Sequence, residues 1–439
     1  MRKIQIRKII IILSVLTTGK MSSYAQDTVV QYFAPNPGVQ KAFALRCNES
    51  SIPPYTLPDP LVLDNGQPVT DSHLWWQQRR PEILSLFENE MYGKTPGFSQ
   101  AVAGFLRTPR TKLLNENKHV LGGKATRREI RLYFTEKDTC FHLDILLYTP
   151  NHAKQKVPAY VMLNFRGNQS VTDDPEVEIS SCWMTPTNDG SVSQFRSTEQ
   201  SRGAAKSRWP IEMIIDRGYA LATACYQQIV PDYDTGIQGE LHTFFYRQGQ
   251  TAPEPNEWGA IGAWAWGMSR IVDYLSTDPH INPGQIVAAG HSRLGKTALW
   301  AGAQDQRFAA VVANNSGCGG GALSKRLFGE TIALLCYVRP HWFCKNFNHY
   351  ANNESALPVD QHELISLIAP RPVLLSTAED DWAADPNGEQ VSLQHAEAVY
   401  RLLGADTETL GFHKRPGKHD VTKQDWEEFL NFTDKCFHR

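Results

Sequence analysis

The chain has 439 residues, of which 41% are hydrophobic and 21% are charged, with a formal net charge of −2. Five basic residues lie in the first 26 positions, so the rest sets 39 basic residues against 46 acidic ones, a net charge near −7. This acidic balance argues against a nucleic-acid partner, which favours a basic face, and the apolar content is that of a globular protein.

The first 26 residues have the pattern of a secretory signal peptide. A basic start precedes a short apolar run over 9–16, and small residues for cleavage follow over 22–26. The basic residues of this start are Arg2, Lys3, Arg7 and Lys8. The apolar run is shorter than the roughly 20 residues that span a bilayer. We therefore expect removal of residues 1–26 and export to the periplasm or the medium; an uncleaved anchor is the alternative.

Residues 27–439 are expected to form a single domain with an N-terminal extension over about 27–100. That extension is rich in proline and polar residues, and its one helix-like stretch is 74–91. Beyond it, strands are predicted at 129–134 and 140–148 as an antiparallel hairpin, then at 157–165, 219–225, 286–289, 308–313, 372–376 and 408–414. Helices are predicted at 258–275, 294–303 and 424–436. This alternation indicates a mostly parallel sheet with helices on both faces.

Eight cysteines occur, and an even count in an exported chain permits disulfides. Cys336 and Cys344 stand close enough to close a short loop. No C-x-x-C or H-E-x-x-H spacing is present, so no metal ligand set is indicated. We expect one or two disulfides at most, no metal and no cofactor.

The segment 290–297, GHSRLGKT, fits two motifs at once. It satisfies G-x-x-x-x-G-K-[ST], a phosphate-binding loop in which Lys296 is the key residue. It is also similar to a nucleophile elbow, with Ser292 on a turn from strand to helix. Both motifs join a buried strand to a helix, so local structure does not separate them.

Position and downstream residues favour the serine. The segment lies two-thirds along the chain after four predicted strands, and an exported protein meets little nucleotide. A hydrolase then needs an acid and a histidine, in that order. Strand 372–376 leads into an acidic turn in which we predict Asp380 as the acid, with Asp381 and Glu379 behind it. His419 follows the last strand, where it can take the serine proton while the acid orients its ring.

The wider sequence resembles the glucuronoyl esterases, carbohydrate esterase family fifteen. GHSRLGK resembles the family signature G-[CH]-S-R-x-G-K, although the second glycine is one residue late for G-x-S-x-G. The resemblance covers about 90–437 and includes the segments 163–168, 258–267, 315–324, 329–330, 380–383 and 418–419. It implies an α/β-hydrolase, a three-layer α/β sandwich, that acts as a secreted serine esterase on esters between 4-O-methyl-glucuronic acid of xylan and lignin alcohols.

The resemblance also assigns roles around the serine. It gives Lys296 to sugar hydroxyls, and it places Glu330 and Trp382 at positions that contact the uronic acid. Arg293 matches a residue whose backbone N–H or guanidinium faces the oxyanion. Lys296 stands one helical turn beyond Ser292 on the same face, so it can reach a group bound there. A second oxyanion donor is expected near 165–166.

One residue departs from the family pattern. Many members carry a glutamate as triad acid at the position that Asn315 occupies here, so the acid must come from Asp380. The expected partner is a carbohydrate uronate ester, with no nucleic acid and no membrane span, and the expected state is a monomer. The alternatives are an acetylxylan or other carbohydrate esterase, a P-loop NTPase, and a catalytically weak carbohydrate-binding relic.

Overall fold

The structure is a computed structural model that describes residues 46–96, 109–138 and 141–438. The predicted signal peptide lies outside these ranges. Within them, no helix has both the length and the apolar character needed to cross a membrane.

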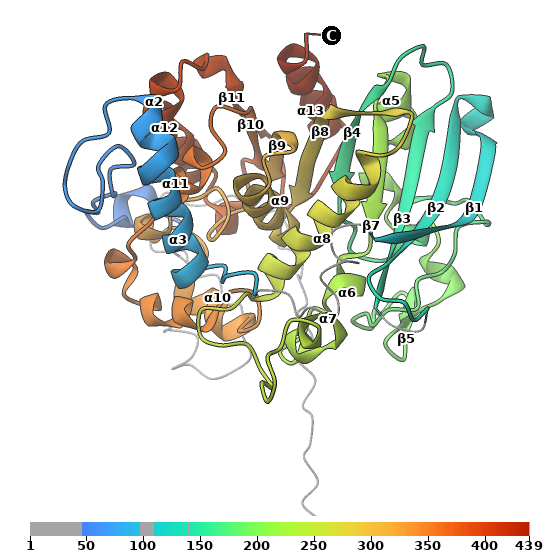
Figure 1. The fold of residues 1–439 in the computed structure, drawn as a ribbon, viewed down its shortest axis with the longest axis horizontal. Coiled ribbons are helices and arrows are strands. Elements are labelled where there is room, and N and C mark those ends of the chain that lie inside the picture. The colour runs from blue at the N-terminus through green and yellow to red at the C-terminus, as the bar shows by residue number, and fades with distance from the viewer. Residues whose placement is uncertain (1–45, 97–108, 139–140, 439) are drawn as a thin grey trace, which may run out of the picture.

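A nine-stranded sheet forms the centre of the fold, in the order β1-β2-β3-β7-β4-β8-β9-β10-β11. Its strands are β1 (Arg110–Val120), β2 (Ala125–Tyr133), β3 (His142–Pro150), β4 (Val157–Met162), β7 (Ala220–Ala224), β8 (Ile281–His291), β9 (Phe308–Asn314), β10 (Val373–Ala378) and β11 (Leu410–Arg415). The six strands from β7 to β11 in this order pair in parallel, whereas β1, β2 and β3 are antiparallel. Figure 1 shows the antiparallel strands at one edge of the sheet. A two-stranded ribbon, β5 (Val192–Ser193) with β6 (Arg196–Ser197), stands apart from it.

Helices cover both faces of the sheet, as predicted (Figure 1). Side chains of α3, α8, α9, α11 and α12 share one buried cluster, and those of α5 and α13 share the other. The helices are α2 (Ser72–Leu74), α3 (Arg80–Glu90), α5 (Ile211–Asp216), α6 (Tyr226–Ile229), α7 (Glu240–Thr243), α8 (Ala260–Leu275), α9 (Arg293–Gln304), α10 (Ile332–Val338), α11 (Gln361–Ser366), α12 (Pro386–Leu402) and α13 (Lys423–Cys436). The three-layer α/β sandwich is therefore confirmed.

Continuous apolar strands explain the two cores. In β8, Ile286 and Ala288 face the cluster that contains α8 and α9, whereas Val287 and Ala289 face the cluster that contains α5 and α13. Successive side chains point to opposite faces of a strand, so a strand covered on both faces is apolar throughout. This is the pattern that predicted the parallel strands.

The segment before the sheet packs onto it. A five-residue π-helical stretch, η2 (Trp75–Arg79), links α2 to α3. Trp75, Ile83 and Phe87 lie in the same buried cluster as α8 and α9. Arg80 donates hydrogen bonds to the carbonyl oxygens of Leu367 and Ala303, at 3.2 and 2.6 Å.

Several elements differ from the prediction. The hairpin of β2 and β3 is present, but an outer strand, β1, extends it and is absent from the predicted strands. Most β1 side chains are exposed, so this edge strand lacks the apolar alternation of a half-buried one. Helices α10, α11 and α12 were also not predicted. Among the described cysteines no disulfide is formed, so Cys336 and Cys344 do not form the bridge that their spacing permits.

The parallel strands bring distant segments together. The carboxyl ends of neighbouring parallel strands meet at one edge of a sheet, where α/β proteins bind their ligands. Here Phe165 follows β4, Ser292 follows β8, Asn315 follows β9, the acidic turn follows β10, and His419 follows β11. Residues up to 254 positions apart in the sequence thus converge on a single site.

Candidate active site

Ser292 occupies a strained turn between β8 and α9. Its backbone has φ 58° and ψ −128°, a conformation that residues other than glycine rarely adopt. A Cβ on Gly290 would lie 1.9 Å from the carbonyl oxygen of Leu294, so only glycine fits there. Backbone strain of this kind clusters at functional sites. The segment 290–297 therefore has the backbone geometry of a nucleophile elbow.

His419 is oriented by Asp381. The distance from His419 Nδ1 to Asp381 Oδ2 is 2.6 Å. Asp381 is 6% exposed and His419 is 36% exposed at the side chain, so a buried carboxylate supports a more accessible ring. The prediction that Asp380 fills this place is wrong by one residue.

The path of the chain after β10 explains that difference. The N–H groups of Glu379 and Asp380 bond to the carbonyl oxygens of Arg415 and Gly417, at 2.8 and 2.9 Å, which continues the pairing with β11. Both of these side chains are exposed. The N–H of Asp381 instead bonds back to the carbonyl oxygen of Ala378 at 3.1 Å. That turn directs the third carboxylate inward.

Asn315 contacts the same carboxylate oxygen. Its Nδ2 donates to Asp381 Oδ2 at 2.6 Å, and its backbone is left-handed with φ 47°. Its N–H also bonds to the carbonyl oxygen of Ser376 at 2.7 Å. At the position where the family resemblance implies an acid, this chain thus places a donor that faces the carboxylate of Asp381.

The ring of His419 lies beside the elbow. Its centroid is 4.6 Å from that of His291, the residue before Ser292. Burial, and then His419, lower the pKa of His291, which favours the neutral ring. Within the described residues Ser292 Oγ forms no hydrogen bond with His419, and such catalytic contacts commonly tighten only with substrate bound.

The three predicted substrate-binding residues lie close to one another near Ser292. They are Lys296, Glu330 and Trp382. Lys296 is 3% exposed, and its Nζ donates to the carbonyl oxygens of Ser316 and Cys318 at 2.6 and 2.5 Å and lies 3.5 Å from Glu330 Oε2. The N–H of Glu330 bonds to the carbonyl oxygen of Ala383, which holds its loop against the turn η11 (Trp382–Ala384). Trp382 is 37% exposed. The lysine is already bonded to protein oxygens, unlike the free lysine of a phosphate-binding loop.

A buried aspartate that the sequence did not reveal holds Arg293. Asp232 pairs with the Arg293 guanidinium and accepts hydrogen bonds from Tyr226, His341 and Trp342. Burial raises the pKa of Asp232, but Arg293 and His341 outweigh burial and hold it well below its usual range. Arg293 is the first residue of α9, where a backbone N–H has no acceptor within its own helix.

A second buried carboxylate supports the loop after β9. Glu389 Oε1 accepts hydrogen bonds from the Ser316 N–H and hydroxyl and from the Gly317 N–H, at 2.6 to 2.9 Å. Burial raises the pKa of Glu389 to about 7, and nearby Asp381 adds to this effect while its hydrogen bonds oppose it. The buried carboxylate of Glu389 therefore holds the loop that carries Asn315 in place.

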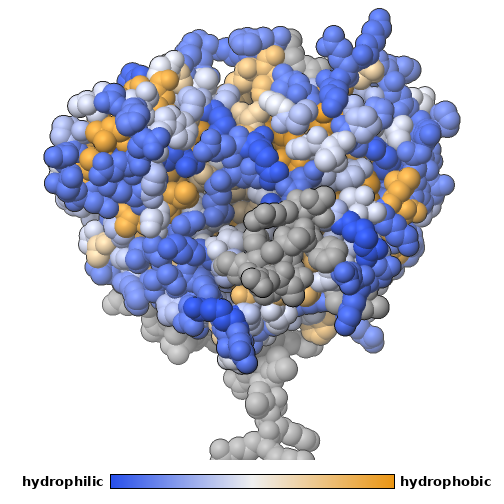
Figure 2. Space-filling model, in the orientation of Figure 1, coloured by the Kyte–Doolittle hydropathy of each residue, from blue (hydrophilic) through white to orange (hydrophobic). Residues whose placement is uncertain are grey.

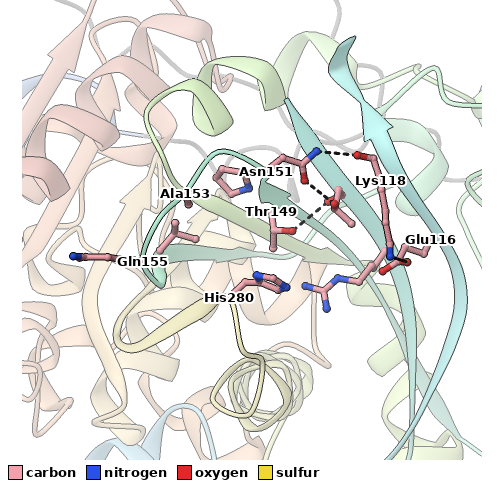
Figure 3. A pocket seen from close by; sticks show the side chains of 11 residues that line it. Glu116, Lys118, Thr149, Asn151, Ala153, Gln155 and His280 are labelled. Carbon is pink, nitrogen blue, oxygen red and sulfur yellow. Dashed lines mark hydrogen bonds and ion pairs between the residues drawn. The ribbon is translucent and has the colours of Figure 1, made fainter. Parts of the chain in front are cut away.

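The cavity in Figure 3 is a different place. It measures about 320 Å³ and is lined by polar side chains that include Glu116, Lys118 and His280. It lies where β3 ends and where β4 and β8 begin, at the sheet edge opposite Ser292. None of the predicted site residues lines it, so we assign the chemistry to the elbow and not to this cavity.

Comparisons with known proteins show which family this chain resembles. A family model described as fungal glucuronyl esterase matches residues 205–404. Carbohydrate esterase MZ0003, from an unknown prokaryotic organism, is 41% identical over 420 residues, which cover 92% of this chain and 94% of that protein. A promiscuous CE15 esterase from a marine bacterial metagenome is 42% identical with a TM-score of 0.81, covering 89% of this chain and 99% of that one. A glucuronoyl esterase from Solibacter usitatus is 40% identical with a TM-score of 0.81, covering 88% and 99%.

The sheet, the elbow and these neighbours define an α/β-hydrolase and a carboxylic ester hydrolase. The chain belongs to the glucuronoyl esterases, carbohydrate esterase family 15. The interpretation of 290–297 as a phosphate-binding loop is therefore wrong.

Proposed function

We propose that this chain is an exported esterase that hydrolyses esters of 4-O-methyl-glucuronic acid, such as those that join glucuronoxylan to lignin alcohols. Ser292 is the nucleophile, His419 the general base and Asp381 the acid. The observation that carries the proposal is the 2.6 Å contact of Asp381 with His419 beside the strained serine elbow. The signal-peptide pattern of residues 1–26 supports export.

The reaction follows from these roles. His419 takes the proton of Ser292 Oγ as the oxygen attacks the ester carbonyl, and Asp381 stabilises the imidazolium. The tetrahedral intermediate expels the alcohol, which leaves with the proton from His419. Water then attacks the acyl-enzyme with His419 again as base, which releases the uronic acid and restores Ser292.

The developing oxyanion needs donors that are already in place. The Arg293 N–H lies at the N-terminus of α9, and a helix N-terminus favours negative charge. Phe165 follows β4, and its ring lies 6.1 Å from that of His291, which supports a second donor from the 165–166 turn. The guanidinium of Arg293 is fixed by its ion pair with Asp232, which holds this residue in place at the start of α9.

The uronate ring is assigned to the other side of the serine. Lys296 and Glu330 form an ion pair there, and Trp382 exposes its indole beside them. Charged and hydroxyl-bonding groups next to an exposed aromatic face suit a sugar acid, whose ring has both polar edges and an apolar face. Because the Lys296 ammonium is already bonded, we assign it to orienting Glu330 as well as to the sugar.

Two assays test this function. Wild type should hydrolyse methyl 4-O-methyl-glucuronate with a higher kcat/KM than acetylated xylan, and Ser292→Ala should lose both activities. A fluorophosphonate probe should label wild type and not Ser292→Ala. Acetyl ester hydrolysis that exceeds uronate ester hydrolysis would retain the serine and reject the substrate. A wild-type chain that is inert to both the probe and the ester would reject the catalytic proposal altogether.

A further inference from the structure

One buried arginine fastens the loop that carries His419. Arg415, the last residue of β11, donates from Nη2 to the carbonyl oxygens of Asp420 and Lys418, at 2.6 and 3.2 Å. Its Nη1 donates to the carbonyl oxygen of Pro416 at 3.1 Å. These three carbonyls lie on both sides of His419 in the sequence. The guanidinium therefore spans the loop whose centre is the proposed base.

Asp425, in the first turn of α13, holds this arginine in turn. Its Oδ2 accepts a hydrogen bond from Arg415 Nε at 2.6 Å, and the two side chains are 0% and 4% exposed. The same oxygen accepts from the Thr422 N–H and hydroxyl, at 2.8 and 2.7 Å, in a capping box. Loss of either partner would leave an unpaired buried charge, so Arg415 and Asp425 hold each other in place.

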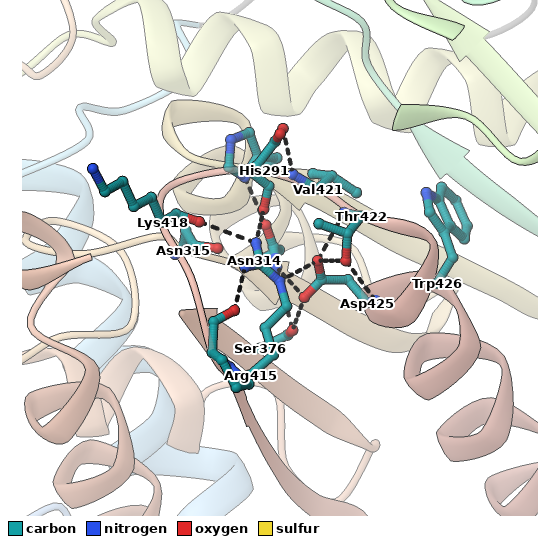
Figure 4. A network of polar contacts seen from close by, with 12 residues as sticks. His291, Asn314, Asn315, Ser376, Arg415, Lys418, Val421, Thr422, Asp425 and Trp426 are labelled. Carbon is teal, nitrogen blue, oxygen red and sulfur yellow. Dashed lines mark hydrogen bonds and ion pairs between the residues drawn. The ribbon is translucent and has the colours of Figure 1, made fainter. Parts of the chain in front are cut away.

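The network continues from Asp425 to the elbow, as Figure 4 shows. Asp425 Oδ1 accepts from Asn314 Nδ2 at 3.3 Å and from the Ser376 hydroxyl at 3.2 Å. Asn314 Oδ1 contacts His291 Nδ1 at 2.6 Å. The ends of β8, β9, β10 and β11 and the start of α13 are thus joined by one set of buried polar contacts.

We propose that Arg415, held by Asp425, is a positioning residue. It sets the position and orientation of the His419 ring relative to Asp381 and Ser292. This inference rests on the proposed role of His419 as the base. Arg415 donates a hydrogen bond to the backbone carbonyl of three residues of the loop, and these contacts restrict the path of the chain on both sides of His419. In this proposal the clamp keeps Nδ1 against Asp381 and leaves Nε2 to take the proton of Ser292.

The test uses a substitution that keeps the positive charge of Arg415 but removes its ability to bond to several carbonyls of the loop at once. In Arg415→Lys a single ammonium can still pair with Asp425, but it cannot reach the carbonyls of 416, 418 and 420 together. We expect kcat for the methyl uronate to fall about 100-fold, the effect of a displacement near 1 Å, with KM within about threefold. The low-field proton signal of His419 Nδ1–H should broaden or disappear.

Arg127→Lys is the matched control. Arg127 is 0% exposed and pairs with Asp174 and Glu176, but it lies in β2 at the opposite end of the sheet. It should lose stability and keep the wild-type kcat and the low-field signal. Equal kcat losses in both variants, or a folded Arg415→Lys with wild-type kcat and signal, would overturn the inference.

A milder change covers the case in which Arg415→Lys does not fold. Ser376→Ala removes one donor to Asp425 and one acceptor of the Asn314 amide. It should lower kcat about threefold and shift the low-field signal, in line with the loss of modest hydrogen bonds. Unchanged kcat and signal would overturn the inference. Failure of the proposed function is a separate result, because there His419→Ala and Ser292→Ala would themselves retain activity.

Discussion

At the residue scale, the electrostatics of the site centre on one oxygen atom. Asp381 Oδ2 contacts both Nδ1 of His419 and Nδ2 of Asn315, each at 2.6 Å. Hydrogen bonds to an ionised carboxylate stabilise its charge, and in the proposed reaction a fixed charge there stabilises the imidazolium. Asn315 therefore contributes through Asp381 and does not replace it.

Removal of the Asn315 side chain should slow the reaction. Glycine tolerates the left-handed backbone at this position, so Asn315→Gly isolates the lost hydrogen bond from strain. A hydrogen bond to a charged group contributes about 1.5–3 kcal/mol, so kcat should fall about 10- to 100-fold with little change in KM. Steady-state kinetics on the methyl uronate measure this, and a kcat within twofold of wild type would contradict the coupling.

Sequence reasoning selected the serine and the histidine that the structure brings to one edge of the sheet, but missed the residues that support them. Ser292 sits in a motif with fixed glycines, and His419 follows the last strand, so both carry a local signal. The choice between Asp380 and Asp381 depends on one hydrogen bond that turns the chain after β10. Asp232 is 61 residues from Arg293, and no spacing in the sequence marks that contact.

At the element scale, a short turn forms one wall of the site. The loop around Gly329 packs so closely on η11 that a Cβ on Gly329 would lie 2.4 Å from the carbonyl oxygen of Ala383. Glu330 therefore stays beside Trp382. This contact joins segments more than 50 residues apart into one surface next to Lys296.

Trp382→Ala should weaken substrate binding and leave the fold intact. The indole is 37% exposed, so its removal leaves no large cavity. We expect KM for the methyl uronate to rise about tenfold, equivalent to about 1.4 kcal/mol, with a small change in melting temperature. Leu113→Ala, at a 53% exposed position on β1, is the control for loss of a surface apolar group. Equal KM values in the two variants would remove Trp382 from the uronate site.

Element prediction succeeded where burial gave a clear pattern. The parallel strands were predictable because both of their faces are covered and their apolar runs are continuous. Strand β1 is an exposed edge and has no such pattern. Helix α12 did carry a signal, because Asp385 caps it and Pro386 occupies its first position.

At the scale of the whole molecule, buried carboxyl groups link stability to pH. Burial raises the pKa of Glu129 and of Glu389 to about 7 and that of Glu363 to about 8. The folded state therefore keeps protons that the unfolded chain has released above its ordinary value of 4.5. Each group thus contributes stability that is lost as the pH rises from about 4.5 through its folded pKa.

Glu389→Gln should reduce that pH dependence. Glutamine keeps the acceptor for Ser316 and Gly317 but cannot ionise, so the variant should lose less stability than wild type between pH 5 and pH 8. The difference is expected to be on the order of 1–3 kcal/mol, measured by thermal or denaturant unfolding at both pH values. Identical slopes in the two proteins would show that Glu389 is not the linked group.

The face of the molecule in Figure 2 does not point to a second functional site away from the edge of the sheet that carries Ser292. Figure 2 shows a face that is largely hydrophilic, with small and scattered apolar patches. Single exposed apolar residues are ordinary on soluble proteins and mark no site by themselves. The functional assignment therefore depends on the convergence of strand ends, and most directly on the carboxylate that meets His419.

The most direct test compares the two neighbouring aspartates. Asp381→Asn and Asp380→Asn are assayed side by side for kcat on methyl 4-O-methyl-glucuronate. Asp381→Asn should lose about 10⁴-fold in kcat, as expected when a triad acid becomes an amide, and Asp380→Asn should stay within about threefold of wild type because its side chain faces solvent. A large loss in Asp380→Asn with near-normal turnover in Asp381→Asn would contradict the proposed active site.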